Sequence, residues 1–132
     1  MTLQDMIAAD ATQYIDVEAH GTTFHLGELS SGDMIDWFEL QGEPAKAKYA
    51  GLYLLVMSLA GPDGERVTKE ERDAVVDVFR KKQAAGNRAL IKKARTLNRL
   101  DELGKTLETL KNVSGGASTG ASPSDSPSKS NV

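Results

Sequence analysis

Cysteine is absent from this chain of 132 residues, and aromatic residues make up only 5% of it. Without cysteine, the chain can form neither a disulfide nor a thiolate metal site. Its longest nearly continuous apolar run, residues 49–60, is too short for a membrane-spanning helix, which needs about 20 residues. The first ten residues lack the basic segment and apolar run of a secretory signal peptide. We therefore expect a cytosolic protein.

Recognisable catalytic patterns are also missing. We find no phosphate-binding glycine loop and no nucleophile elbow. His25 lies opposite Asp16 in a predicted hairpin, but no third group is suitably spaced, so we interpret the two as a solvated pair. A calcium loop aligned on Gly64 would put Leu59 and Gly61 at its first two ligand positions, which excludes it. The sequence predicts no enzyme, no cofactor and no metal site.

Residues 113–132 are dominated by Ser, Gly, Ala and Pro. Such a segment buries too little apolar surface to offset the entropy lost on ordering, so we predict that it is disordered. Residues 1–112 remain, enough for a single small domain.

A β-hairpin is predicted over residues 14–28. A two-residue turn at His20-Gly21 places the apolar residues on one face of the hairpin and the polar residues on the other. The alternation fails at Gly27-Glu28, where the second strand should end or bulge. The predicted register pairs Ile15 with Leu26, Val17 with Phe24, Ala19 with Thr22, Asp16 with His25, and Glu18 with Thr23.

Four helices are predicted after the hairpin. Ser30 or Ser31 can cap the first, in which Trp37 and Phe38 should pack in the core. A turn at residues 61–64 follows the second helix, and a Thr-x-x-Glu capping box at Thr68 begins the third. Gly86-Asn87 should end the third helix. The predicted bounds are about 31–41, 45–60, 69–85 and 88–111, which gives a predominantly helical α+β fold with an N-terminal hairpin.

Charge is divided unevenly along the chain. Residues 1–65 carry a net charge of -9, whereas residues 66–113 carry +6. Residues 80–99 contain eight Lys or Arg and no acid. This run could neutralise phosphates of a nucleic acid, form the solvated face of a helix, or bind an acidic protein partner, including the acidic half of a second copy. The lack of aromatic residues in the run argues against nucleic acid.

A leucine stripe follows the basic run. From Leu100 onward its spacing alternates between three and four residues, as in two heptads of a coiled coil. Two heptads are too few to be stable alone, so the stripe should order against a partner. The predicted partner-binding residues combine both features and are Arg88, Lys92, Arg95, Leu97, Arg99, Leu100, Leu103 and Leu107.

The order of these segments resembles the tail assembly chaperones of long-tailed, siphovirus-type bacteriophages. The likeness covers roughly residues 14–80 and is carried by the hairpin, the FHLGELSSGD stretch at 24–33, the apolar helix, the Asp63-Gly64 turn and the next capped helix.

The resemblance implies a non-enzymatic chaperone in the host cytoplasm that is absent from the mature virion. It would bind the apolar, helical tape measure protein and recruit major tail protein subunits, and it could self-associate. Members are often also made as a longer, frameshifted product. The alternatives are a small nucleic-acid-binding regulator and a structural tail or connector component.

Overall fold

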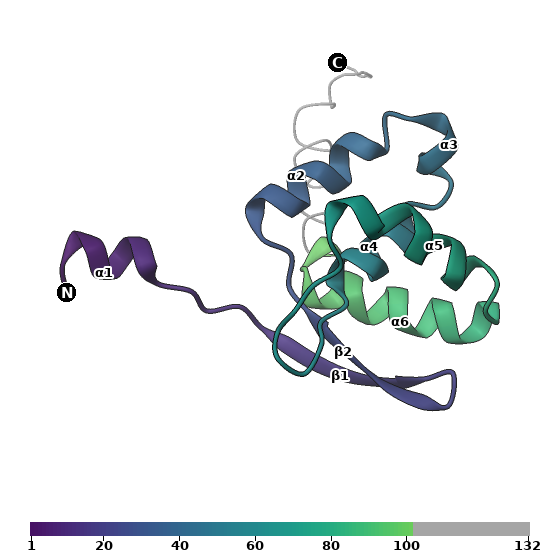
Figure 1. Ribbon diagram of the computed structural model, residues 1–132, viewed down its shortest axis with the longest axis horizontal. Helices are drawn as coiled ribbons and strands as arrows, with labels where there is room; N and C mark the ends of the chain where they lie inside the picture. Colours follow the sequence, from purple (N-terminus) through teal and green to yellow (C-terminus); the bar gives the residue numbers. More distant parts are fainter. Residues whose placement is uncertain (102–132) are drawn as a thin grey trace, which may run out of the picture. The chain divides into compact units, whose positions relative to one another are not determined.

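The computed structural model describes residues 1–101 and divides the chain into two units, Met1–Asn98 and Arg99–Val132. It confirms the predicted fold class, a two-stranded antiparallel hairpin within a predominantly helical chain (Figure 1). The predicted tail at 113–132 lies outside the described residues. The elements are α1 (Leu3–Ala8), β1 (Tyr14–Ala19), β2 (Thr22–Gly27), α2 (Ser31–Leu40), α3 (Pro44–Ala47), α4 (Ala50–Ser58), a 3-10 turn η1 (Lys69–Glu71), α5 (Arg72–Arg80) and α6 (Ala84–Leu97).

Helix α4 is the centre of the first unit. It contacts α2, α5, α6 and β2, and its residues from Tyr53 to Ser58 are all buried. A helix that is apolar on every side must be covered on every side. This explains why the most apolar stretch of the sequence, residues 49–60, supplies the core.

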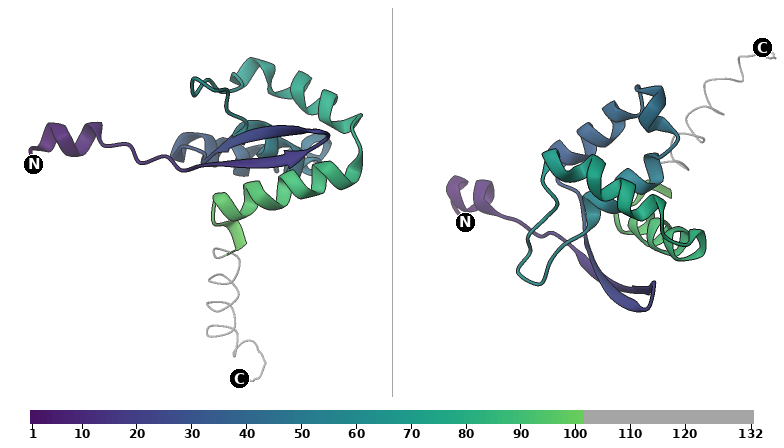
Figure 2. Two further views of the ribbon diagram at one scale, coloured as in Figure 1. Left: turned by 90° about the horizontal axis from the view of Figure 1, so that it is seen from below. Right: turned by 45° about the vertical axis from the view of Figure 1, so that its right-hand side comes forward.

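The hairpin has the predicted register, with all five predicted pairs in place. Its apolar face packs on the helices, since β1 contacts α6 and β2 contacts α4 (Figure 2). Strand β2 ends at Gly27, as expected. A Cβ at this position would lie 2.7 Å from the Tyr14 ring and 3.0 Å from the Arg66 guanidinium. Only glycine therefore leaves room for these two side chains where they lie.

The loop after α4 extends the hairpin on the β2 side. Leu59 bridges to Leu26, and the Ala60 backbone N–H donates to the His25 carbonyl at 2.9 Å. The loop then turns through Gly64, whose φ of +81° suits glycine. The edge of β2 is thereby partly paired.

Helix α2 begins where the sequence predicts. Ser30 is its N-cap and accepts a hydrogen bond from the Asp33 N–H at 3.2 Å. Trp37 is buried, as predicted, and its indole N–H donates to the Ala50 carbonyl at 2.8 Å. The prediction for Phe38 is wrong, because this side chain remains 48% exposed.

The predicted helix at 45–60 is two helices. Helix α3 ends at Ala47, and a turn through Lys48 and Tyr49 precedes α4. Tyr49 leaves the helical conformation, with φ of -110° and ψ of 20°. Its ring lies under the Arg80 guanidinium, 4.4 Å from the centroid, a long-range contact that the local pattern does not contain.

The predicted boundary between the last two helices is wrong. Helix α5 ends at Arg80, and α6 already begins at Ala84, so Gly86 and Asn87 lie inside the first turn of α6. Glycine is needed at 86 because a Cβ would lie 2.4 Å from the ring of His20 in the hairpin turn. Gly86 therefore does not end a helix. It allows the hairpin turn to pack closely against α6.

The predicted continuous helix at 88–111 is also wrong, because α6 ends at Leu97. Arg99 has a φ of +59°, a left-handed conformation that disfavours helix continuation. The amide of Asn98 donates to the Ala94 carbonyl at 2.9 Å, and its oxygen accepts from the Leu29 N–H at 2.8 Å. These bonds hold the end of α6 beside the start of α2.

Candidate partner-binding surface

Helix α6 is amphipathic. Its inward face carries Asn87, Leu90 and Ala94, all of which are buried. The opposite side is exposed and basic, because the charged residues fall between the buried positions at helical spacing. We call this side the cationic face of α6; its members are Arg88, Lys92, Lys93 and Arg95.

Within residues 1–101, three of the four cations of this face are not neutralised by a carboxylate in the way that Arg72 is. Within residues 1–101, Arg88, Lys92 and Lys93 form no ion pair with a carboxylate. No acid lies between positions 80 and 99, so the helix itself supplies no opposite charge. Such a surface can attract an anionic partner from a distance of about one Debye length.

The structure unites only part of the predicted binding set. Arg88, Lys92 and Arg95 lie exposed on α6, and Leu97 is half-buried at its end. Lys93 was not predicted as a site residue, although it belongs to the same basic run. Arg99 and Leu100 belong to the second unit, and Leu103 and Leu107 lie outside the described residues.

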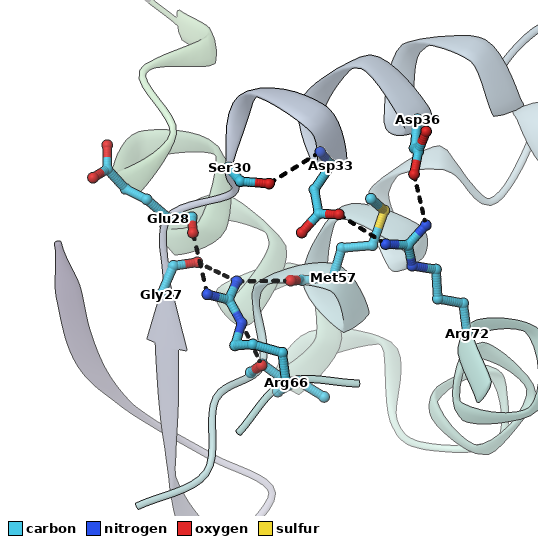
Figure 3. A network of polar contacts seen from close by, with 9 residues as sticks. Gly27, Glu28, Ser30, Asp33, Asp36, Met57, Arg66 and Arg72 are labelled. Atoms are coloured by element: carbon cyan, nitrogen blue, oxygen red, sulfur yellow. Dashed lines mark hydrogen bonds and ion pairs between the residues drawn. The ribbon is translucent and has the colours of Figure 1, made fainter. Parts of the chain in front are cut away.

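Arg72 has a different role from the cations of α6. Its guanidinium pairs with Asp33 at 3.0 Å and with Asp36 at 3.4 Å, joining α5 to α2 (Figure 3). The Arg72 side chain is only 12% exposed. Some of the basic residues of the second half of the sequence therefore pair with acidic residues of the first half within the molecule.

Arg66 is a second structural arginine, and it binds only backbone carbonyls in this region (Figure 3). Nη2 donates to Met57 at 2.8 Å and to Gly27 at 3.1 Å, Nε donates to Leu59 at 3.1 Å, and Nη1 donates to Glu28 at 3.3 Å. One side chain thus joins the end of α4 to the end of β2. No local pattern predicts this role, because the four acceptors come from two distant segments.

A cavity of about 230 Å³ lies between α2, α4 and α5. At its wall the Tyr53 hydroxyl donates to Asp73 at 2.6 Å, and Lys46 lies 3.7 Å from the same carboxylate. Burial raises the pKa of Tyr53 to about 12, and the hydrogen bond to Asp73 adds to this effect. A tyrosine that holds its proton so firmly is a poor general base or nucleophile at neutral pH. We interpret the cluster as structural.

The His25–Asp16 pair lies on the outer face of the hairpin. The two side chains are 2.6 Å apart, and the Tyr14 ring stacks on the imidazole with centroids 5.2 Å apart. Both partners are well exposed, at 39% and 67%. The arrangement matches a solvated cross-strand pair. Among residues 1–101, no three potential metal ligands come together.

No helix within residues 1–101 has the length and apolarity to cross a bilayer. Comparison of the chain with protein-family models, curated proteins and solved structures yields no match.

Proposed function

We propose that this protein is a non-enzymatic tail assembly chaperone of a long-tailed bacteriophage, acting in the host cytoplasm on the tape measure protein and the major tail protein. One observation carries the proposal: the hairpin at 14–27 and the capped helix α2 follow each other in the order on which the resemblance rests. The loop at 59–66 and the capping box at Thr68 continue the same order.

The cationic face of α6 supplies a means of binding. It is an exposed helix surface on which Arg88, Lys92 and Lys93 have no carboxylate partner among residues 1–101, and the half-buried Leu97 lies at its end. An amphipathic segment of the tape measure protein that bears acids beside its apolar stripe would complement it. Contacts of this kind exchange readily, because exposed ion pairs contribute little each. Tail subunits could then displace the chaperone.

The test is co-expression with the tape measure protein encoded in the same genome. We expect the chain to raise the solubility of the tape measure protein and to co-purify with it. The double variant Arg88→Glu/Lys92→Glu should reduce co-purification at least about tenfold. Lys69→Glu is the matched control, since Lys69 is exposed and lies outside α6. No gain in solubility and no co-purification with the unaltered chain would contradict the proposal.

Because the cationic face is exposed, a second function is also consistent with the structure, namely that of a nucleic-acid-binding regulator. Binding to phosphates would weaken steeply with salt, with a slope set by the number of phosphates neutralised. An electrophoretic shift assay at low salt distinguishes the two candidates. A shift that Arg88→Glu/Lys92→Glu abolishes would favour the regulator, and the absence of any shift would remove it.

A further inference from the structure

Strand β1 forms an open edge of the hairpin. In an antiparallel pair of strands, alternate residues direct their backbone N–H and C=O groups away from the partner strand. The bond from the Ala60 N–H to the His25 carbonyl shows that His25 is such a residue. Asp16 pairs with His25 and therefore also directs its backbone groups outward. By the same alternation, Tyr14 and Glu18 direct theirs to the same edge.

The outward backbone groups of β1 have no partner within residues 1–101. No N–H or C=O of Tyr14, Asp16 or Glu18 forms a hydrogen bond to another segment of this part of the chain. The sheet has two strands among these residues, and Figures 1 and 2 show no third strand beside β1. Such a row of unpaired groups is a template for one further strand.

The edge of β2 is different, because other groups occupy most of it. The His25 carbonyl accepts from Ala60 at 2.9 Å, and the Gly27 carbonyl accepts from Arg66 at 3.1 Å. Strand β1 has no such covering loop. It also lacks the proline, lysine or bulge that commonly blocks an edge strand. Strand addition is therefore expected at β1 and not at β2.

Acidic side chains on β1 determine which strand its edge can accept. Asp16 and Glu18 lie on the outer face of the hairpin, Asp16 is 67% exposed, and Glu18 forms no ion pair within residues 1–101. Opposite charges directly across a strand pair stabilise a sheet, whereas like charges destabilise it. A complementary strand therefore carries Lys or Arg at alternate positions. Its intervening residues would point to the side on which α6 packs and should be uncharged.

We propose that β1 binds an extended, cationic segment of another protein by strand addition. Pairing of β1 with β1 of a second copy is disfavoured, because antiparallel pairing centred on Asp16 or Val17 sets acid against acid. The chain's own residues after 101 are also unsuited, because their only basic residues, at 105, 111 and 129, are never two positions apart. This inference does not depend on the proposed function, which uses α6, so the two can fail separately.

A synthetic peptide tests the binding. The probe is a blocked seven-residue peptide with Lys at three alternating positions and Val or Thr at the others. Titrated into the isotopically labelled full chain and followed by NMR, it should bind saturably with a Kd below about 1 mM and more weakly as salt rises. A peptide of the same composition with its three Lys adjacent should bind at least about tenfold more weakly. No saturable binding of the alternating peptide would overturn the proposal.

Amide hydrogen exchange tests where the peptide binds. The amides of Asp16 and Glu18 have no acceptor in the free protein, so saturating peptide should slow their exchange at least about tenfold. The Thr23 amide also points outward, because Thr23 pairs with Glu18, but it lies on the β2 edge and should not change. Slower exchange at Thr23 and not at Asp16 and Glu18 would contradict the assignment to β1.

Methylation of the peptide backbone separates strand addition from charge attraction alone. One peptide is N-methylated at two of its Lys residues and the other at its two Val residues, so their charges are equal. Because only alternate N–H groups of an added strand face β1, one methylated peptide should lose at least about tenfold in affinity and the other should keep most of it. Loss on Lys methylation indicates an antiparallel strand, and loss on Val methylation a parallel one. Equal affinities would overturn the proposal.

Substitutions at residue 18 separate the charge from the backbone. Glu18→Thr removes the acid and should weaken binding about threefold, as expected for one cross-strand charge pair. Glu18→Pro also removes the outward N–H and should weaken binding at least about tenfold further, without breaking a bond of the hairpin. Thr23→Pro blocks the β2 edge and should bind as the unaltered chain does. Circular dichroism checks that each variant is folded, and unaltered binding by folded Glu18→Pro would contradict the proposal.

Discussion

Two groups of cations in the basic half of the sequence behave in opposite ways. Arg66 and Arg72 lie within the first unit, where carbonyls and carboxylates occupy their guanidinium groups (Figure 3). Arg88 and Lys92 lie on α6, exposed and without an ion pair among residues 1–101. The first pair holds distant segments together, whereas the second pair lies on the exposed surface of α6. A net charge cannot separate these roles, because it depends on composition and not on position.

Loss of Arg66 should have the largest effect on stability. Arg66→Ala leaves four carbonyls without their charged donor, and hydrogen bonds to charged groups contribute about 1.5–3 kcal/mol each before exposure reduces them. We expect a decrease in the free energy of unfolding of about 3 kcal/mol or more, measured by urea denaturation.

The matched variants for this prediction are Arg66→Lys and Lys69→Ala. A lysine keeps the charge but has no planar fork, so Arg66→Lys should lose most of the same stability. Lys69→Ala removes an exposed cation and should change little. A decrease below about 1 kcal/mol for Arg66→Ala would show that the carbonyls are satisfied without it.

The buried Tyr53 should make the free energy of unfolding depend on pH, unlike the solvated side chains of α6. The folded-state pKa of Tyr53 is raised from 10.0 to about 12, so the folded state holds this proton more tightly than the unfolded state. The contribution is fully present below pH 10 and is lost as pH rises through 12, by about 2 kcal/mol. Tyr53→Phe should show a shallower loss of stability between pH 10 and 12, measured by urea denaturation at each pH. Equal slopes for the two proteins would contradict it.

Gly86→Ala should have an intermediate effect. The new methyl group would meet the His20 ring, whose Nε2–H donates a hydrogen bond to the Asn87 side-chain oxygen at 2.9 Å. Displacing the ring should cost about 1–3 kcal/mol, partly offset by about 1 kcal/mol of helix propensity. His20→Ala should reverse the sign of the Gly86→Ala effect in a double-mutant cycle. An additive cycle would mean that the hairpin turn does not press on α6.

The smallest effect is expected on the cationic face. Arg88→Glu/Lys92→Glu should change the free energy of unfolding by less than about 0.5 kcal/mol, because both side chains are exposed and have no ion pair within the described residues 1–101. Thermal melting followed by circular dichroism provides the measurement. A loss comparable to that of Arg66→Ala would make α6 a structural surface and remove the contrast drawn above.

The hairpin could be predicted from sequence because its information is local. Alternation fixes which side chains share a face, and the two-residue turn fixes the pairing, so the register was predicted correctly. A cap at Ser30 or Ser31 was predicted for the same reason, since a cap depends on side chains within three residues, and Ser30 is the one that the structure uses. Of the predicted partner-binding residues, Arg88, Lys92 and Arg95 could be assigned to one exposed helix surface because they are three or four residues apart.

The errors arose where distant contacts decide. Gly86 resembles a helix end, but the structure uses it to admit His20, which is 66 positions earlier in the chain. Arg99 interrupts the predicted helix at 88–111 in a left-handed conformation that arginine rarely adopts, so no residue type in the sequence predicts the break. Helix α1 was missed although its Thr2–Asp5 cap is visible in the sequence, because six residues carry little periodic signal.

The contact between His20 and Gly86 has a practical consequence for engineering. Tight hairpin turns are usually chosen as sites for epitope insertions or fluorescent labels, because they tend to be solvent-exposed. Here the tip at His20 is wedged against a helix, and an insertion would displace it. Asp63 and Gly64 are both exposed, and a Cβ added at Gly64 would meet no atom within 4 Å, so the Asp63-Gly64 turn is the better place for a probe.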